Sequence, residues 1–149
     1  MKKLFLPAGL MLCITWLQAQ QPATKEQLAV QQTIVKLFDA LSVRDTVALR
    51  TYSTADITFY EYGERWTMDT LIAKAVKPGV PADFKRTNSF EFIQTATNQS
   101  MAWATYHLQS VIIKDGKQTT MQWLETVVLV KEDKRWKIQH LHSTLLKRS

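Results

Sequence analysis

Residues 101–146 read MAWATYHLQSVIIKDGKQTTMQWLETVVLVKEDKRWKIQHLHSTLL, and this stretch decides the fold. Three long runs rich in β-branched and aromatic residues are separated by two short polar turns, Asp115-Gly116-Lys117 and Glu132-Asp133-Lys134. Connections of this length, the first with an Asp-Gly pair, are typical of β-hairpins. The pattern predicts antiparallel strands over 101–114, 118–131 and 135–146, and residues 84–97 predict a fourth strand before them.

The segment before these strands has helical spacing. Apolar residues recur three and four positions apart after Lys25, and Thr24 with Gln27 forms a capping-box pattern. We expect a helix over 25–42 and a second short helix around 47–52. A short strand over 57–62 and a third helix over 68–77 complete the pattern. This order predicts an α+β fold, with three helices packed on one face of a curved, mainly antiparallel sheet.

The N-terminus has the pattern of a cleavable export signal. Lys2 and Lys3 precede an apolar run over 4–17, and the small residue Ala19 precedes a polar segment. The apolar run is shorter than the ~20 residues that a membrane-spanning helix needs. We therefore expect a signal peptide over 1–19, no stable membrane anchor, and a periplasmic or secreted mature protein.

Composition narrows the classes of partner. The chain has 19 Lys and Arg against 13 Asp and Glu, a net charge of +6. Its basic residues are scattered rather than clustered, so we expect no nucleic-acid partner. The single cysteine, Cys13, lies inside the signal, so no disulfide can stabilise the mature domain. Lipidation there is disfavoured because Leu12 stands where the processing enzyme needs a small residue.

The last strand carries a resemblance to a known superfamily, through the segment Trp136-Lys137-Ile138-Gln139-His140-Leu141-His142-Ser143. This segment resembles the end of the calcium/calmodulin-dependent kinase association domain. Together with Glu125-Thr126 and the Asp-Gly hairpin, it makes residues 25–147 similar to the nuclear-transport-factor-2-like superfamily, especially its SnoaL-like branch. The resemblance implies a cone-shaped, cystatin-like fold, and it implies that a homodimer can form through the open sheet face.

The resemblance also suggests which side chains line the cone. Association domains carry pocket arginines on two neighbouring strands, at positions that match His107 and Val127 here, so an arginine anion site is not carried over. If these matches mark the concave face, alternation brings further residues inward: Trp103, Thr105, His107 and Gln109 from one strand, and Trp123, Glu125 and Val127 from the next.

Glu125 is the strongest candidate for chemistry, because a carboxylate in an otherwise apolar strand is costly to bury without a partner. With His107 beside it, Glu125 would form a catalytic acid–base pair. The alternatives are a structural hydrogen-bonding pair and a glutamate at a solvated edge.

Aromatic residues and histidines form the candidate ligand-binding set: Tyr60, Trp66, Trp103, Trp123, His140 and His142. They can stack on a small hydrophobic or aromatic molecule, or they can fill the cone themselves. Alternation does not decide which face of the last strand lines the cavity. His140 and His142 lack a compact ligand motif around them, so we expect no metal, and no cofactor motif is present.

Three functions remain open from the sequence. The first is an exported small-molecule-binding domain with an aromatic-lined apolar cavity. The second is a cofactor-independent isomerase, dehydratase or hydratase that uses Glu125 and His107. The third is a dimeric assembly or interaction module.

Overall fold

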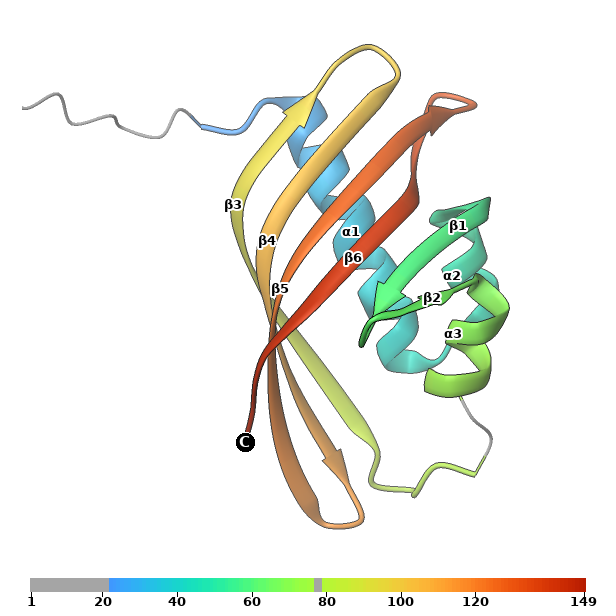
Figure 1. The fold of residues 1–149 in the computed structure, drawn as a ribbon, viewed down its shortest axis with the longest axis vertical. Helices are drawn as coiled ribbons and strands as arrows, with labels where there is room; N and C mark the ends of the chain where they lie inside the picture. The colour runs from blue at the N-terminus through green and yellow to red at the C-terminus, as the bar shows by residue number, and fades with distance from the viewer. Residues whose placement is uncertain (1–21, 77–78) are drawn as a thin grey trace, which may run out of the picture.

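The computed structural model describes residues 22–76 and 79–149, so the predicted signal peptide over 1–19 lies outside the described residues. A six-stranded sheet in the order β2-β1-β6-β5-β4-β3 forms one layer, and the helices form the other (Figure 1). Within the described part of the chain, no helix combines the length and hydrophobicity needed to cross a membrane.

The four long strands are β3 (Lys85–Thr97), β4 (Met101–Lys114), β5 (Lys117–Glu132) and β6 (Arg135–Arg148). They pair antiparallel in sequence order, as predicted. The other two strands are β1 (Ser53–Glu61), which pairs parallel with β6, and the short β2 (Glu64–Trp66), which the sequence did not indicate.

The helices begin where their caps predict. In α1 (Lys25–Val43) the Thr24 hydroxyl accepts from the Gln27 backbone N–H, and the Gln27 side chain accepts from Thr24 N–H. Asp45 caps α2 (Thr46–Thr51), and Thr67 caps α3 (Met68–Ala75). In Figure 1, α1 passes behind the long strands, while α2 and α3 gather beside β1 and β2.

Turn chemistry fixes the register of the longest hairpin. Asp115 and Gly116 both have positive φ, at 53° and 68°, as a two-residue primed turn requires. Lys114 therefore pairs with Lys117, and counting back along the two strands places Tyr106 opposite Glu125.

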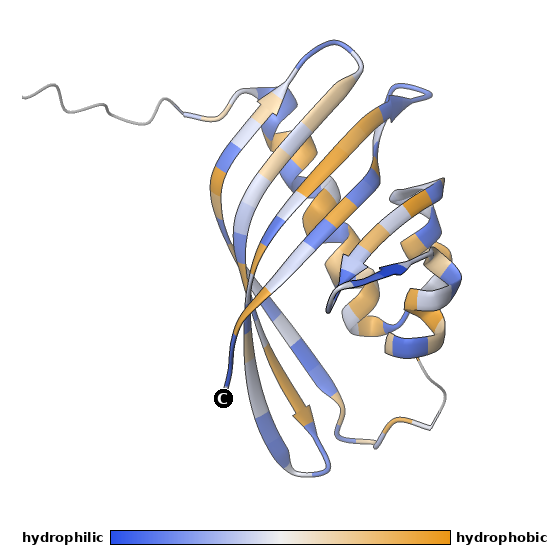
Figure 2. Cartoon of the chain, viewed as in Figure 1, coloured by the Kyte–Doolittle hydropathy of each residue, from blue (hydrophilic) through white to orange (hydrophobic). Residues whose placement is uncertain are grey.

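The core lies between α1 and the concave face of the sheet. Hydrophobic and polar residues alternate along the strands (Figure 2). On β4 the buried residues are the even-numbered ones, Ala102, Ala104, Tyr106, Leu108 and Ser110. The expectation that Trp103, Thr105, His107 and Gln109 line the concave face was therefore wrong. These four side chains lie on the convex face, because the strand presents the more apolar set to the core.

Candidate functional site

A row of polar groups crosses the concave face of the sheet. Tyr106 on β4 stands opposite Glu125 on β5, and Glu125 stands opposite Ser143 on β6. Glu61, the last residue of β1, extends the row by a hydrogen bond to Ser143. Four neighbouring strands thus contribute one polar side chain each to the same interior line.

Glu125 is the more buried of the two carboxyl groups in this row, with only 3% of its surface exposed. Its Oε1 contacts the Ser143 hydroxyl at 2.9 Å, whereas its Oε2 has no hydrogen-bond partner in the described structure. The Tyr106 hydroxyl is close enough to affect the carboxyl group, yet it too lacks a partner with hydrogen-bonding geometry. An unpaired buried polar atom costs free energy, so these two oxygens are a costly feature of the interior.

Burial raises the pKa of Glu125 to about 7, and the negative charge of Glu61 adds to the rise. The neighbouring Tyr106 and Ser143 hydroxyls and the Arg86 guanidinium act in the opposite direction. Burial also raises the pKa of Tyr106 well above its ordinary value. At neutral pH the Glu125 carboxyl is therefore close to half-protonated, which suits a group that gives and takes protons.

Glu61 lies nearer the surface and is partly buried. Its Oε1 is 2.7 Å from the Ser143 hydroxyl oxygen. Desolvation raises the pKa of Glu61, and the hydrogen bond from Ser143 opposes that rise. The two carboxyl groups therefore share one small hydroxyl between them.

Arg86 on β3 is the cation of the interior. Its Nε donates to Asn88 Oδ1 at 3.0 Å, and its Nη2 donates to Ser110 Oγ at 3.1 Å. The guanidinium lies 5.8 Å from the ring centroids of both Phe38 and Trp123. Burial lowers the pKa of Arg86, which nonetheless stays protonated. Its positive charge faces the two carboxyl groups without forming an ion pair within 4.0 Å among the described residues.

A hollow of about 280 Å³ opens beside this row, between the β1–β2 turn and the C-terminal half of strand β6. Its lining includes Glu61, Trp123, Ser143 and Leu145. The volume lies just below the ~300–1,000 Å³ typical of ligand pockets. A ligand seated in the hollow would touch Glu61 and Ser143 directly and would reach the Glu125 side of the row through Ser143.

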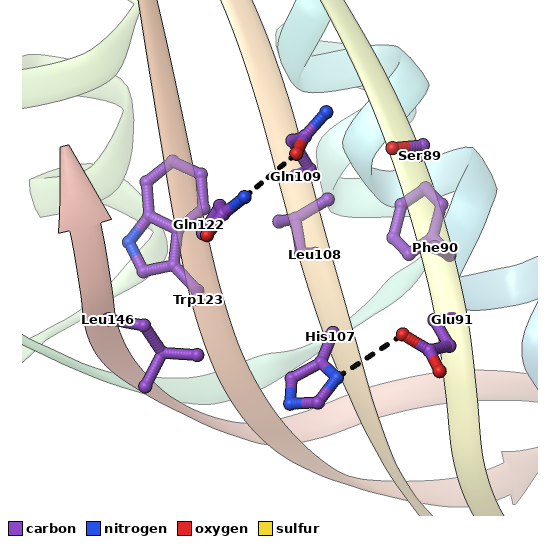
Figure 3. Close-up of a pocket in the computed structure, with 9 residues that line it drawn as sticks. All are labelled: Ser89, Phe90, Glu91, His107, Leu108, Gln109, Gln122, Trp123 and Leu146. Carbon is purple, nitrogen blue, oxygen red and sulfur yellow. Dashed lines mark hydrogen bonds and ion pairs between the residues drawn. The ribbon is translucent and has the colours of Figure 1, made fainter. Parts of the chain in front are cut away.

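A second hollow, of about 400 Å³, lies at the convex face around His107 (Figure 3). His107 Nδ1 is 3.4 Å from Glu91 Oε2, and Gln122 Nε2 donates to Gln109 Oε1 at 2.9 Å. All four of these side chains are solvent-exposed or nearly so. This hollow is larger than the first one, but it holds no buried ionisable group.

The structure does not bring the predicted acid–base pair together. Glu125 points into the core, whereas His107 is opposite Leu124 in the register and points to the convex face. The expected contact between Glu125 and His107 was therefore wrong, because the even-numbered residues of β4 face the core and His107 faces the other way. The hydrogen-bond partner of Glu125 is Ser143, and the residue opposite Glu125 on β4 is Tyr106.

The candidate ligand-binding residues fall into three places. Trp123 is 7% exposed on the concave face, and Trp66 is 8% exposed near α3, where its Nε1 donates to Glu64. Tyr60, Trp103 and His140 lie on the convex face, away from the interior row, whereas the exposed His142 lines the hollow beside Glu61. The aromatic set therefore does not line one cavity.

The two histidines of β6 interact with β1. His140 Nδ1 is 2.9 Å from Thr58 Oγ1, and the Tyr60 ring centroid is 5.3 Å from His140 and 6.1 Å from His142. In the described ranges no three His, Cys, Asp or Glu side chains are grouped as metal ligands.

Sequence reasoning missed Arg86, Tyr106, Ser143 and Glu61 as site residues. The hairpin register was the available signal for Tyr106, since the two-residue turn alone places it opposite Glu125. Arg86 and Glu61 carried no such local signal. Glu61 joins the row and Arg86 faces it because β1 and β3 belong to the same curved sheet.

Solved structures share this fold at low sequence identity. A CamKII hub homology domain from Chlamydomonas reinhardtii has a TM-score of 0.74 at 20% identity, covering 83% of this chain and 100% of its own. A ketosteroid isomerase-like protein from Erwinia carotovora has a TM-score of 0.67 at 14% identity, covering 84% and 99%. An NTF2-like protein from Cytophaga hutchinsonii has a TM-score of 0.66 at 16% identity, covering 83% and 100%.

These likenesses confirm the α+β, nuclear-transport-factor-2-like fold that the sequence predicted. No curated protein shows a significant sequence match. The profile of the SnoaL-like domain, however, matches residues 30–146, which is most of the chain and includes the whole interior row. This chain belongs to the SnoaL-like domain family.

Proposed function

We propose that this SnoaL-like chain is an exported small-molecule-binding domain whose ligand enters the hollow beside Glu61 and Trp123. The main observation behind this proposal is that Oε2 of Glu125 has no hydrogen-bond partner, although the residue is only 3% exposed. Such an atom is costly in a protein interior, and a ligand hydroxyl or N–H group that reaches past Ser143 would donate to it. The proposed export rests on the N-terminal pattern of residues 1–19.

The surroundings indicate the kind of ligand. Trp123, with the Arg86 guanidinium over its ring, supplies a flat apolar wall, and Glu61 with Ser143 supplies polar groups at one end. We therefore expect a small hydrophobic or aromatic molecule with one hydrogen-bonding head group.

Ligand binding is tested by thermal-shift screening of the mature chain against small aromatic and alicyclic compounds, followed by calorimetry with each hit. Glu61→Gln should weaken binding about tenfold or more, since it changes a polar group at the entrance. Glu91→Gln makes the same chemical change on the convex face and should leave affinity unchanged. Loss of binding in Glu91→Gln with retention in Glu61→Gln would place the ligand in the convex hollow and contradict the proposal. A screen without hits would also count against it.

A proton-transfer enzyme is the second candidate, and the pKa of Glu125 near 7 favours it. In this version Glu125 would act as the acid or base on a bound substrate, and Tyr106 rather than His107 would stand beside it. The expected reactions are cofactor-independent isomerisation, hydration or dehydration. If a ligand is found, Glu125→Gln should abolish its turnover while leaving its binding measurable.

Assembly is the third candidate, and it is compatible with the other two. The convex face exposes Met101 at 49% and Trp103 at 37%, apolar side chains that a homodimer would cover. Sedimentation velocity at micromolar concentration should then show a dimer, and Trp103→Glu should convert it to a monomer.

A further inference from the structure

The Ser143 hydroxyl lies between two carboxyl groups, and it cannot form hydrogen bonds to both of them if both are ionised. Its Oγ lies 2.7 Å from Glu61 Oε1 and 2.9 Å from Glu125 Oε1. A serine hydroxyl carries one proton, so it can donate to only one of these oxygens. If both carboxyl groups were ionised, the other contact would join two acceptor oxygens with no proton between them.

The remaining contact becomes a hydrogen bond if one carboxyl group is protonated and donates to Ser143 Oγ. The serine then donates its own proton to the other carboxylate, and both short distances are explained. A cation between the two carboxylates would be the alternative. Arg86 does not take that place, because its Nε and Nη2 are directed to Asn88 and Ser110.

We propose that Glu125, Ser143 and Glu61 form a proton relay. The relay shares one carboxyl proton between Glu125 in the interior and Glu61 at the hollow, which is the mouth of the cone. In the transfer step Glu125 gives the proton on Oε1 to Ser143 Oγ, while Ser143 gives its hydroxyl proton to Glu61 Oε1. Both O–H bonds that break are replaced, the serine ends neutral, and the negative charge moves from Glu61 to Glu125. The relay deepens the proposed function, because it rests on the same site and would exchange protons between Glu125 and a ligand or solvent at the mouth.

The difference in burial between Glu125 and Glu61 decides which of the two carboxyl groups holds the proton. Glu125 is the more buried end, and its pKa of about 7 makes it the group that holds the proton near neutral pH. Glu61, at the mouth, is the better solvated end and carries the charge. Arg86 from β3, His142 from β6 and Tyr106 from β4 are the other titratable groups that face the pair. The positive charge of Arg86 favours ionisation of both carboxyl groups, so one proton is held rather than two.

The relay is tested without any ligand by following the side-chain carboxyl carbons of the mature, glutamate-labelled chain by NMR across pH. In the wild-type protein the signals of Glu61 and Glu125 should each show two titration steps at shared pH values, as expected for coupled groups. Glu61→Gln removes the neighbouring charge and frees the serine proton for Glu125, so the Glu125 pKa should fall by roughly one pH unit. Ser143→Ala removes the hydroxyl that can donate to either carboxylate when that group is ionised, so both pKa values should rise.

Two controls separate a relay from a general disturbance of the fold. Ser143→Thr keeps the hydroxyl and should restore wild-type titration, while Glu91→Gln on the convex face should leave both curves unchanged. Glu61→Gln is nearly isosteric at the rim of the sheet, so it decides the question even if Ser143→Ala fails to fold. Independent single-step curves, or a Glu125 pKa unmoved by Glu61→Gln, would overturn the relay.

The relay and the proposed binding function can fail separately. Coupled titration in a chain that binds none of the screened compounds would support the relay and contradict the binding function. Ligand binding with two independent carboxyl titrations would do the reverse.

Discussion

Two glutamates on opposite faces of the same sheet contact one neighbouring side chain each, yet they differ greatly in their exposure to water. Glu125 on the concave face is 3% exposed and touches Ser143 at 2.9 Å. Glu91 on the convex face has 81% of its side chain exposed and meets His107 at 3.4 Å. Water solvates Glu91 and screens its charge, whereas Glu125 depends on a few protein groups. Depth in the curved sheet, more than residue type or hollow size, therefore makes the interior row the candidate site.

The largest expected difference between the two faces is in the free energy of unfolding that is lost when a tryptophan is replaced by alanine. Trp123→Ala would open a cavity beside Arg86 and should lower the free energy of unfolding by about 3–5 kcal/mol. Trp103→Ala, at 37% exposure on the convex face, should cost about 1–2 kcal/mol. Urea unfolding of both variants measures the difference. Equal losses would mean that the convex face is buried in solution, as in a dimer.

The second prediction uses the pKa of Glu125. Its ordinary pKa of 4.5 applies to the unfolded chain, and folding raises it to about 7. Between these values the folded state binds more protons at Glu125, so the contribution of Glu125 to the free energy of unfolding is fully present below pH 4.5 and is lost as pH rises through 7. At about 1.4 kcal/mol per pH unit, Glu125 alone accounts for a loss of up to about 3 kcal/mol.

Glu125→Gln should remove most of this pH dependence, because the amide does not titrate. The smaller part that remains belongs to Glu61, whose pKa is also raised. Denaturant unfolding at pH 5, 6, 7 and 8 measures the slope, and Glu91→Gln is the matched control that should keep it. An unchanged slope in Glu125→Gln would show that the carboxyl group ionises freely in the folded state.

Much of the fold could be predicted from the sequence because its signals are local. The capping box of Thr24 and Gln27 and the Asp115-Gly116 turn act within a few residues. Prediction of the site depended on which side chains of β4 face the core. We inferred that face from the positions that match the pocket arginines of association domains. The stronger physical signals were the hairpin register and the apolar character of Ala102, Ala104 and Leu108. Glu61 reaches the row through the parallel pairing of β1 with β6, a long-range contact that no local pattern encodes.

A third prediction compares amide side chains on the two faces. Asn88 Nδ2 donates to Ser42 Oγ at 2.8 Å, and its Oδ1 accepts from Arg86 and Ser110. Asn88→Ala would leave these groups without their partner and should cost about 1–3 kcal/mol. Gln109→Ala on the convex face breaks one exposed hydrogen bond and should cost less than about 0.5 kcal/mol. Chemical denaturation distinguishes the two, and similar costs would argue against a tightly ordered interior network.

The smallest expected effect belongs to the convex ion pair of His107 and Glu91. The pair is long at 3.4 Å, and water reaches both side chains, with 47% and 81% exposed. Exposed pairs of this kind contribute little, because solvent screens the attraction and ordering two side chains costs entropy. Either His107→Ala or Glu91→Gln should change the free energy of unfolding by less than about 0.5 kcal/mol, and the double variant should show almost no coupling energy. A double-mutant cycle in denaturant unfolding measures this coupling energy. A coupling energy above about 1 kcal/mol would mean that the convex hollow excludes water, and the contrast between the two faces would then have to be abandoned.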